Sequence, residues 1–398
     1  MTLIVAVPEP VPILLMARQL DQGGVERDLT KLALHIDRSR FTPHVATYFD
    51  HGMRFQELWD AKIPLLHLPV TSIASRSALE AVCRMSRYVR ENGIKLIHAF
   101  DTTALLATIV ARLTRTLVVT CQLSYREICD SRTVLTLRWS DYLTHVVQVN
   151  CKEMQRYLIE NEHVSPDRVE LCYNGVETAV FYPAKVSKPK ALDGAGLVIG
   201  TVCALRPEKN LQLLQEAFAN VRHCSSGLKL LIVGSGAELR RLRENAASLS
   251  IADASVFIPA TPEVASWMRA IDIFVLPSYS EAFSNSLLEA MACGCAVVGS
   301  RVGGTPELIG ENERGLLFEN GDADELCAQL QNLIGDEDLR RTLSIRAAQF
   351  ANEHLNLGIA LERQSEIYER LLRRRNPQIA HLVAGRAPTS DLNESRGG

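Results

Sequence analysis

The sequence lacks several features that would place it in a specialised class of protein. Its ten cysteines form no CxxC pair and no grid of cysteine and histidine residues, so neither a structural zinc site nor a disulfide framework is indicated. Several cysteines stand inside apolar runs, such as Cys121 in VVTCQL and Cys203 in GTVCAL. We therefore expect reduced thiols packed in the cores of a cytosolic protein.

An excess of charge of one sign is also absent. The formal net charge is -3 and there is no long basic run, so neither nucleic acid nor an anionic membrane is favoured as a bulk electrostatic partner. The first twenty residues are apolar, but they carry three prolines and no basic leader, which argues against a signal peptide or a spanning helix. We expect a cytoplasmic protein with at most peripheral contact with the inner face of a membrane.

What the sequence does contain is a regular alternation of strand and helix patterns. The apolar runs are continuous, as is typical of parallel strands buried on both faces, and helical periodicity falls between them, for example over 24–36 and 78–92. This order predicts two Rossmann-like, doubly wound α/β domains that face each other across a cleft. The runs are 12–17, 44–49, 64–69, 95–100, 117–124, 145–150 and 169–174 in the first half, then 197–205, 228–234, 255–260, 273–278, 296–301 and 315–320.

Changes in composition suggest where the domains begin and end. Residues 1–180 form the predicted first domain, and 181–196, rich in proline, lysine and glycine, form the linker. The predicted second domain covers 197–354 and is followed by a helix over 355–375. The tail, 376–398, lacks periodicity and is expected to be disordered.

In each half, one motif follows the first predicted strand, at the edge where ligands of such sheets bind. Gly23 and Gly24 precede a helix whose free N–H groups suit a phosphate, although a flexible turn explains them equally well. Arg206 and Lys209, in LRPEKN, could together neutralise a diphosphate. A solvated charged turn is the alternative for this second motif.

The stretch SEAFSNSLLEAMACGC sets Glu281 and Glu289 eight positions apart. One interpretation is structural, because Ser286 and Glu289 have the spacing of a helix capping box. In the functional interpretation, N–H groups near Ser284 and Asn285 face an anion while both carboxylates accept hydrogen bonds from sugar hydroxyls. The residues alone leave both interpretations open.

A second helix start is predicted in RVGGTPELI. Thr305 is the expected N-cap and Pro306 the first helical residue, after a Gly-Gly turn. This helix would begin at the same edge of the sheet as the one after Glu281.

The stretch 278–309 resembles the glutamate–seven residues–glutamate signature of retaining, nucleotide-sugar-dependent glycosyltransferases with the GT-B fold. The most similar group is glycosyltransferase family four, which includes many bacterial cell-surface and mannosyl transferases. The resemblance implies a C-terminal helix that crosses back to the first domain. It extends over nearly the whole chain, through GGVE (23–26), HAF (98–100), YNGVETAVFYP (173–183), RPEK (206–209) and VGSGAELRRL (233–242).

The resemblance also implies roles for individual residues. Glu281 would contact the transferred sugar, Glu289 the ribose hydroxyls, and Arg206 with Lys209 the diphosphate. Gly23 and Gly24 would close over the diphosphate from the other domain. The remaining residues implied in donor binding are Ile258 and Ala260 near the base, and Ala282, Phe283, Ser284 and Asn285 before and at the helix.

Two positions depart from the family pattern. An arginine is usual where Ala204 stands, so Arg206 would have to supply its charge. A histidine that touches the donor sugar is usual where Gln122 stands. His98 remains as a nearby catalytic candidate, although a lone histidine at a strand end is more often structural.

These observations predict transfer of a sugar from a UDP- or GDP-linked donor to the hydroxyl of a glycan or lipid-linked acceptor, with retention of configuration. This activity would serve polysaccharide biosynthesis in the cell envelope. No DxD-like pair stands at a strand end in a metal-binding arrangement, and cations can neutralise the diphosphate, so neither a metal nor a cofactor is expected. The alternatives are a nucleotide-sugar epimerase of the same fold and a non-catalytic nucleotide-sugar sensor.

Overall fold

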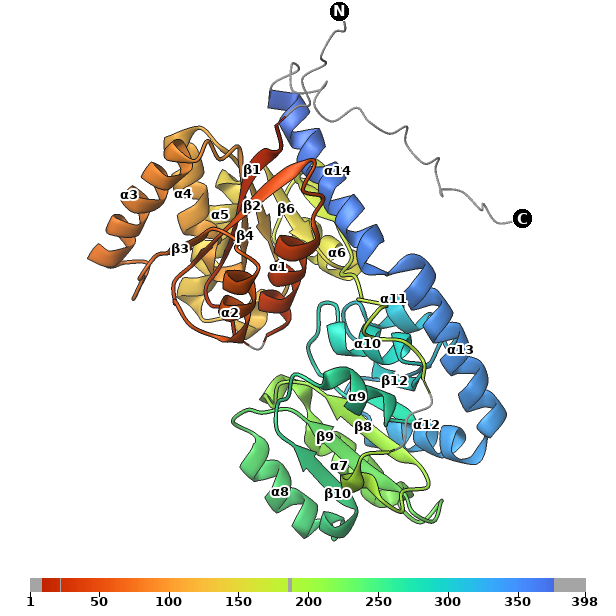
Figure 1. Cartoon of the computed structure of the whole chain (residues 1–398). Helices are drawn as coiled ribbons and strands as arrows, with labels where there is room; N and C mark the ends of the chain where they lie inside the picture. The colour runs from red at the N-terminus through yellow and green to blue at the C-terminus, as the bar shows by residue number, and fades with distance from the viewer. Residues whose placement is uncertain (1–8, 22, 185–187, 376–398) are drawn as a thin grey trace, which may run out of the picture.

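The computed structural model describes residues 9–21, 23–184 and 188–375. It contains two parallel sheets, each within its own α/β domain (Figure 1), so the predicted doubly wound architecture is confirmed. The predicted disordered tail lies outside the described residues. Within the described part of the chain, no helix is long and apolar enough to cross a bilayer.

The first sheet has seven parallel strands in the order β3-β2-β1-β4-β5-β6-β7. Along β1, Ile13 and Leu15 pack with α1 and α14, whereas Leu14 and Met16 pack on the opposite face with α3 and α4, as the two-residue period of a strand requires. Its strands are β1 (Val11–Ala17), β2 (Phe41–Thr47), β3 (Leu65–His67), β4 (Leu96–Phe100), β5 (Leu117–Cys121), β6 (Val146–Val149) and β7 (Val169–Leu171). Its helices are α1 (Gly24–His35), α2 (Met53–Asp60), α3 (Arg76–Glu91), α4 (Ala104–Thr114), α5 (Ser131–Leu143) and α6 (Lys152–Glu160).

The second sheet has six parallel strands in the order β10-β9-β8-β11-β12-β13. Every strand of both sheets overlaps one of the predicted apolar runs. The strands are β8 (Val198–Val202), β9 (Lys229–Val233), β10 (Ser255–Ile258), β11 (Ile273–Leu276), β12 (Ala296–Ser300) and β13 (Leu316–Phe318). The helices are α7 (Leu211–Val221), α8 (Leu239–Ser248), α9 (Val264–Arg269), α10 (Asn285–Ala292), α11 (Thr305–Ile309), α12 (Ala323–Gly335) and α13 (Glu337–His354).

The last helix, α14 (Leu357–Arg375), returns to the first domain, as predicted (Figure 1). Ile367 and Tyr368 are fully buried in the same core as β1 and α1. The Tyr368 ring meets Phe41 edge to face, with 5.6 Å between ring centroids. The first domain is therefore completed by the end of the chain, because α14 supplies part of its core.

The chain passes between the domains twice, and the two passing segments are hydrogen-bonded to each other. Val176 N donates to Leu355 O, and Leu357 N donates to Val176 O, both at 2.8 Å. The neighbouring Gly175 has no room for a side chain, since a Cβ there would lie 2.7 Å from the Leu357 Cα. Within the predicted linker, Phe181 packs in a core that both domains share, and 185–187 lie outside the described residues.

Candidate functional site

Helix α10 begins at the carboxyl edge of the second sheet, in the loop after β11. Ser284 is its N-cap, because Ser284 Oγ accepts a hydrogen bond from Leu287 N at 3.3 Å. The predicted capping box of Ser286 and Glu289 is therefore wrong. With the helix starting two residues earlier, Glu289 is its fifth residue and its side chain points away from the cap.

Glu289 instead faces the first domain. Its carboxylate is 2% exposed, and its Oε1 lies 2.8 Å from Arg27 Nη2 of helix α1, although the pair lacks the alignment of a hydrogen bond. Burial raises the pKa of Glu289, and the positive charges of Arg27 and Lys31 oppose this rise. The ion pair is thus a direct electrostatic link between the domains.

A second link joins the same two helices beside Asn174, close to where the chain passes between the domains. Asp28 of α1 accepts hydrogen bonds from Asn285 Nδ2 at 3.0 and 3.1 Å, and from Asn174 Nδ2 at 3.1 Å. Burial raises the pKa of Asp28, against the opposing effect of the nearby Lys31. Lys31 is itself held in place, because its Nζ donates to Gly175 O at 3.1 Å.

The N-termini of α1 and α10 lie next to each other. Gly23 is the N-cap of α1 and Gly24 its first residue, and a Cβ on Gly24 would lie 3.5 Å from Asn285 Nδ2. The structure therefore brings the predicted Gly23, Gly24, Ser284 and Asn285 together. Both helices direct free N–H groups and the positive ends of their dipoles to this place, which suits an anion.

Glu281 and Lys209 form an ion pair at the same edge. Lys209 Nζ donates to Glu281 Oε2, which also accepts from Ser278 Oγ at 3.3 Å. Burial lowers the pKa of Lys209, but the adjoining Glu281 carboxylate outweighs it, so the pKa is raised overall. This shift favours the charged form of Lys209.

The turn that carries Glu281 is held by two glycines. Gly304 N donates to Ala282 O at 2.6 Å. Gly303 has a φ of +50°, and a Cβ there would lie 1.6 Å from Glu281 O. Gly304, rather than the predicted Thr305, is the N-cap of α11. These backbone contacts fix the direction in which the Glu281 side chain leaves the loop.

The remaining predicted donor residues differ in position. The side chains of Ala282 and Phe283 are buried, and Phe283 packs on Tyr173 with ring centroids 5.6 Å apart, so they support the turn. Ile258 ends β10 and Ala260 follows it, two strands away from β8 on the same edge. Ala260 N donates to Ser235 Oγ at 3.0 Å, which orders the backbone there.

Arg206 does not join this group. Its side chain is 62% exposed, approaches Glu208 at 3.8 Å, and lines a surface hollow with Glu238 and Arg241. We expected it to replace a charge at position 204, but strand β8 ends at Val202, so strand alternation no longer relates residues 204 and 206. Lys209 is the member of the predicted pair that the structure brings to Glu281.

His98 is also placed away from the cleft, contrary to its prediction as a catalytic candidate. It is completely buried, with Nδ1 hydrogen-bonded to Tyr368 Oη and Nε2 at 2.8 Å from Cys121 Sγ. Burial lowers its pKa to about 3, so the ring is neutral. Gln122 is likewise buried, donating to Ser124 O and accepting from Arg126.

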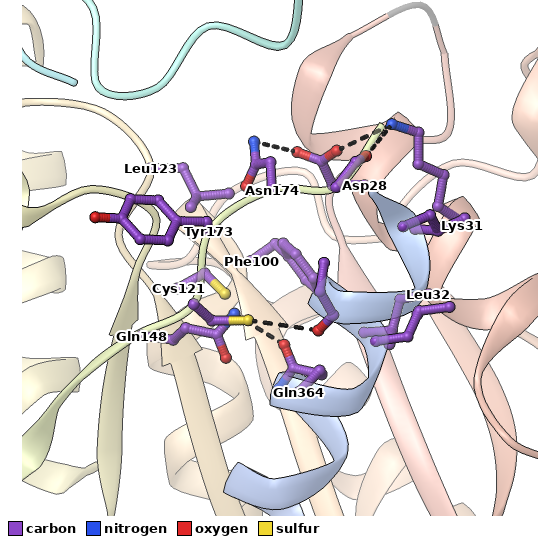
Figure 2. A pocket seen from close by; sticks show the side chains of 15 residues that line it. Asp28, Lys31, Leu32, Phe100, Cys121, Leu123, Gln148, Tyr173, Asn174 and Gln364 are labelled. Carbon is purple, nitrogen blue, oxygen red and sulfur yellow. Dashed lines mark hydrogen bonds and ion pairs between the residues drawn. The ribbon is translucent and has the colours of Figure 1, made fainter. Parts of the chain in front are cut away.

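A small cavity lies between the first sheet, α1 and α14 (Figure 2). Gln148 Nε2 donates to Gln364 Oε1 at 2.9 Å, while Asp28 and Lys31 line its other side. Its volume of about 60 Å³ has room for a few water molecules, since one water needs about 10–15 Å³ of space measured in this way. The cavity therefore suits small polar molecules such as water.

All ten cysteines are free, and five of them are buried in the cores as expected, whereas Cys83 and Cys224 are exposed. Among the described residues, no group of three or more His, Cys, Asp or Glu side chains is placed to hold a metal ion.

Three residues of the site, Arg27, Asp28 and Asn174, were not predicted from the sequence. A signal was present in GGVERDLTKLA, because Arg27 and Lys31 are four residues apart and so share one face of α1. That face carries the charges that meet Glu289. Nothing in the local sequence indicates which helix this face of α1 contacts.

The chain is similar to two families of known proteins, each over one domain. Residues 22–180 match the family model described as Glycosyltransferase Family 4, and residues 184–350 match the one described as Glycosyl transferases group 1. Among curated proteins, the N-acetyl-alpha-D-glucosaminyl L-malate synthase of Bacillus anthracis is 30% identical over 217 residues, which is 54% of this chain and 57% of that protein. The D-inositol 3-phosphate glycosyltransferase of Acidothermus cellulolyticus is 35% identical over 202 residues, or 47% and 45%. The chain spans about half the length of these relatives.

Solved structures confirm the predicted GT-B fold. Anabaena HepE in complex with UDP-glucose has a TM-score of 0.79 at 20% identity, over 90% of this chain and 99% of that one. WaaG, a glycosyltransferase involved in lipopolysaccharide biosynthesis, has a TM-score of 0.69 at 16% identity, over 90% and 99%. At these identities the likeness concerns the fold alone.

The Gly303 turn gives a matched test of how tightly the Glu281 loop is fixed. Gly321 also has a positive φ, +82°, but nothing lies within 4 Å of its Cβ position. Gly321→Ala should lower the free energy of unfolding by about 1–2 kcal/mol from backbone strain alone. Gly303→Ala should cost clearly more, because the new Cβ displaces the Glu281 carbonyl. Urea denaturation of both variants measures the difference, and equal losses would show that the turn is not constrained in this way.

Proposed function

We propose that this chain, which belongs to the family-four type of GT-B glycosyltransferases, transfers a sugar from a nucleotide-diphosphate sugar to an acceptor hydroxyl with retention of configuration. The observation that carries this proposal is the meeting of the two helix N-termini with Lys209, Glu281 and Glu289 at one edge. This arrangement combines anion-binding groups with two carboxylates that can accept hydrogen bonds from hydroxyls.

In the proposed complex the diphosphate lies at the N-termini of α1 and α10, with Lys209 beside it. Glu289 accepts hydrogen bonds from the ribose, and Glu281 from the transferred sugar. The base lies along the backbone of 258–260, where Ser235 orders Ala260. The UDP-glucose complex of the Anabaena protein favours a UDP-sugar as the first donor to test, with GDP-linked sugars such as GDP-mannose as the second.

The proposed chemistry rests on fixed positive groups. As the sugar–phosphate bond breaks, negative charge grows on the diphosphate, and preorganised donors stabilise it; one such donor contributes about 2.7–4 kcal/mol in other enzymes. The acceptor hydroxyl attacks on the face from which the diphosphate leaves and passes its proton to the departing phosphate oxygen. Because Lys209 and the helix N-termini already supply positive charge, we propose that no metal ion or other cofactor is required.

The acceptor is proposed to be a hydroxyl-bearing molecule such as a glycan or a lipid-linked sugar. The names of the relatives also point to small anionic acceptors, an inositol phosphate and malate, which belong in the same screen.

Peripheral contact with a membrane is a further part of the proposal. Helix α5 exposes Leu135, Trp139 and Tyr142 at helical spacing, an apolar stripe that would insert at a lipid surface. Cosedimentation with anionic vesicles tests it, and binding that is unchanged in Trp139→Ser would contradict a role for this stripe. Exposed arginines that favour anionic lipid are Arg132 on α5 itself and Arg112 on the neighbouring α4.

The activity is tested by incubating the full chain with UDP- and GDP-sugars, with and without acceptor, in the presence of EDTA. We expect nucleotide diphosphate and glycosylated acceptor to form together, and NMR of the product to show the donor's anomeric configuration. Release of nucleotide and free sugar without acceptor would favour an epimerase, and binding without turnover a sensor. Loss of turnover in EDTA that manganese or magnesium restores would overturn the metal-free mechanism.

Lys209 and Arg206 provide a direct contrast between the structure and the sequence pattern. Lys209→Ala should lower turnover by about 10²–10³-fold, the usual loss for one donor to a developing charge, with a melting temperature only a few degrees lower. Arg206→Ala should stay within a few-fold of the unmodified enzyme, because its side chain faces solvent. Initial rates with saturating donor measure both, and equal losses would return Arg206 to the diphosphate site.

A further inference from the structure

Glu289 forms an ion pair with Arg27 of the other domain. The 2.8 Å contact between Arg27 Nη2 and Glu289 Oε1 joins the two domains. If Glu289 accepts hydrogen bonds from a ribose, as proposed above, its carboxylate has to turn from the guanidinium to the hydroxyls.

An Arg27 side chain that leaves Glu289 can reach the site proposed above for the diphosphate. It stands one turn after Gly23 and Gly24 on α1, and its N–H bonds to Gly23 O at 3.1 Å, so its side chain starts beside the converging helix N-termini. The guanidinium is 20% exposed and sits on a flexible stem, which lets it turn toward those N-termini without backbone movement. Lys31 lacks this freedom because it is tied to Gly175 O and lies 3.9 Å from Asp28.

The charge of the ligand calls for such a cation. In the second domain, Lys209 lies at this edge in contact with Glu281. Arg206 faces solvent instead, and Ala204 carries no charge. A diphosphate bears more than one negative charge and gains more as the sugar departs. A planar guanidinium can bind two phosphate oxygens at once, which a lysine cannot do.

We propose that Arg27 exchanges partners when the donor binds, from the Glu289 carboxylate to the diphosphate. The same residue then neutralises Glu289 in the empty enzyme and clamps the phosphates in the complex. Because Arg27 belongs to the first domain and Lys209 to the second, the diphosphate ties the domains together. This inference rests on the proposed donor site.

The test is calorimetric titration of the full chain with a nucleoside diphosphate and its monophosphate, UDP with UMP and GDP with GMP. Arg27→Gln should lower the ratio of diphosphate to monophosphate affinity by about ten- to a hundredfold, the size of lost hydrogen bonds to a charged group. Arg27→Lys should recover part of that ratio. The matched control is Arg240→Gln, an arginine 90% exposed and paired with Glu244 on α8, whose ratio should not change.

The outcomes separate this inference from the proposed function. If Arg27 only neutralises Glu289, the affinities for diphosphate and monophosphate fall by the same factor in Arg27→Gln, and the exchange is refuted. If the unmodified chain binds neither UDP nor GDP, the donor site itself is misplaced. Should Arg27→Gln fold poorly, an unchanged ratio in Arg27→Lys together with unchanged turnover would equally overturn the exchange.

Discussion

The contact between α1 and α10 is the interaction on which the rest of the site depends. Two buried carboxylates, Glu289 and Asp28, lie at this contact, and each is compensated from the opposite domain, by Arg27 and by Asn285. Removing one partner of a buried charge is costly, because the remaining charge stays desolvated. The domains are therefore held in a defined relation, and neither domain alone contains the complete set of groups.

The positions of the reactive groups follow from backbone constraints more than from side-chain packing. Gly303 and Gly304 lie so close to Glu281 and Ala282 that only glycine fits, and Ser284 sets the first residue of α10. Where the chain passes between the domains, Gly175 lies equally close to the backbone of Leu357 and leaves no room for a side chain. Such rigid placement of donors and acceptors is what stabilisation of a developing charge requires.

Much of the fold could be predicted because strands buried on both faces leave continuous apolar runs, and α14 has clear helical periodicity. Lys209 and Glu281 could be predicted as site residues because they follow strands at one edge. The start of α10 could not, since Ser284 and Ser286 are both good N-caps, and a shift of two residues turns Glu289 from a cap into a cleft residue. His98 appeared available only because α14, which covers it, comes from the far end of the chain. The partner of Arg27 depends on the packing of two domains, which no local pattern encodes.

If Glu289 faces the donor as proposed, one mild substitution will reveal it. Glu289→Gln keeps the size of the side chain but leaves one acceptor and a misplaced donor toward a ribose. Calorimetric titration with UDP and GDP should show affinity lower by about ten- to a hundredfold than in the unmodified chain, from hydrogen bonds to charged groups of about 1.5–3 kcal/mol. Glu244→Gln, on the surface of α8, is the control that should not change. Equal affinities in a folded Glu289→Gln protein would contradict the account and leave the Arg27–Glu289 pair as a purely structural link between the domains.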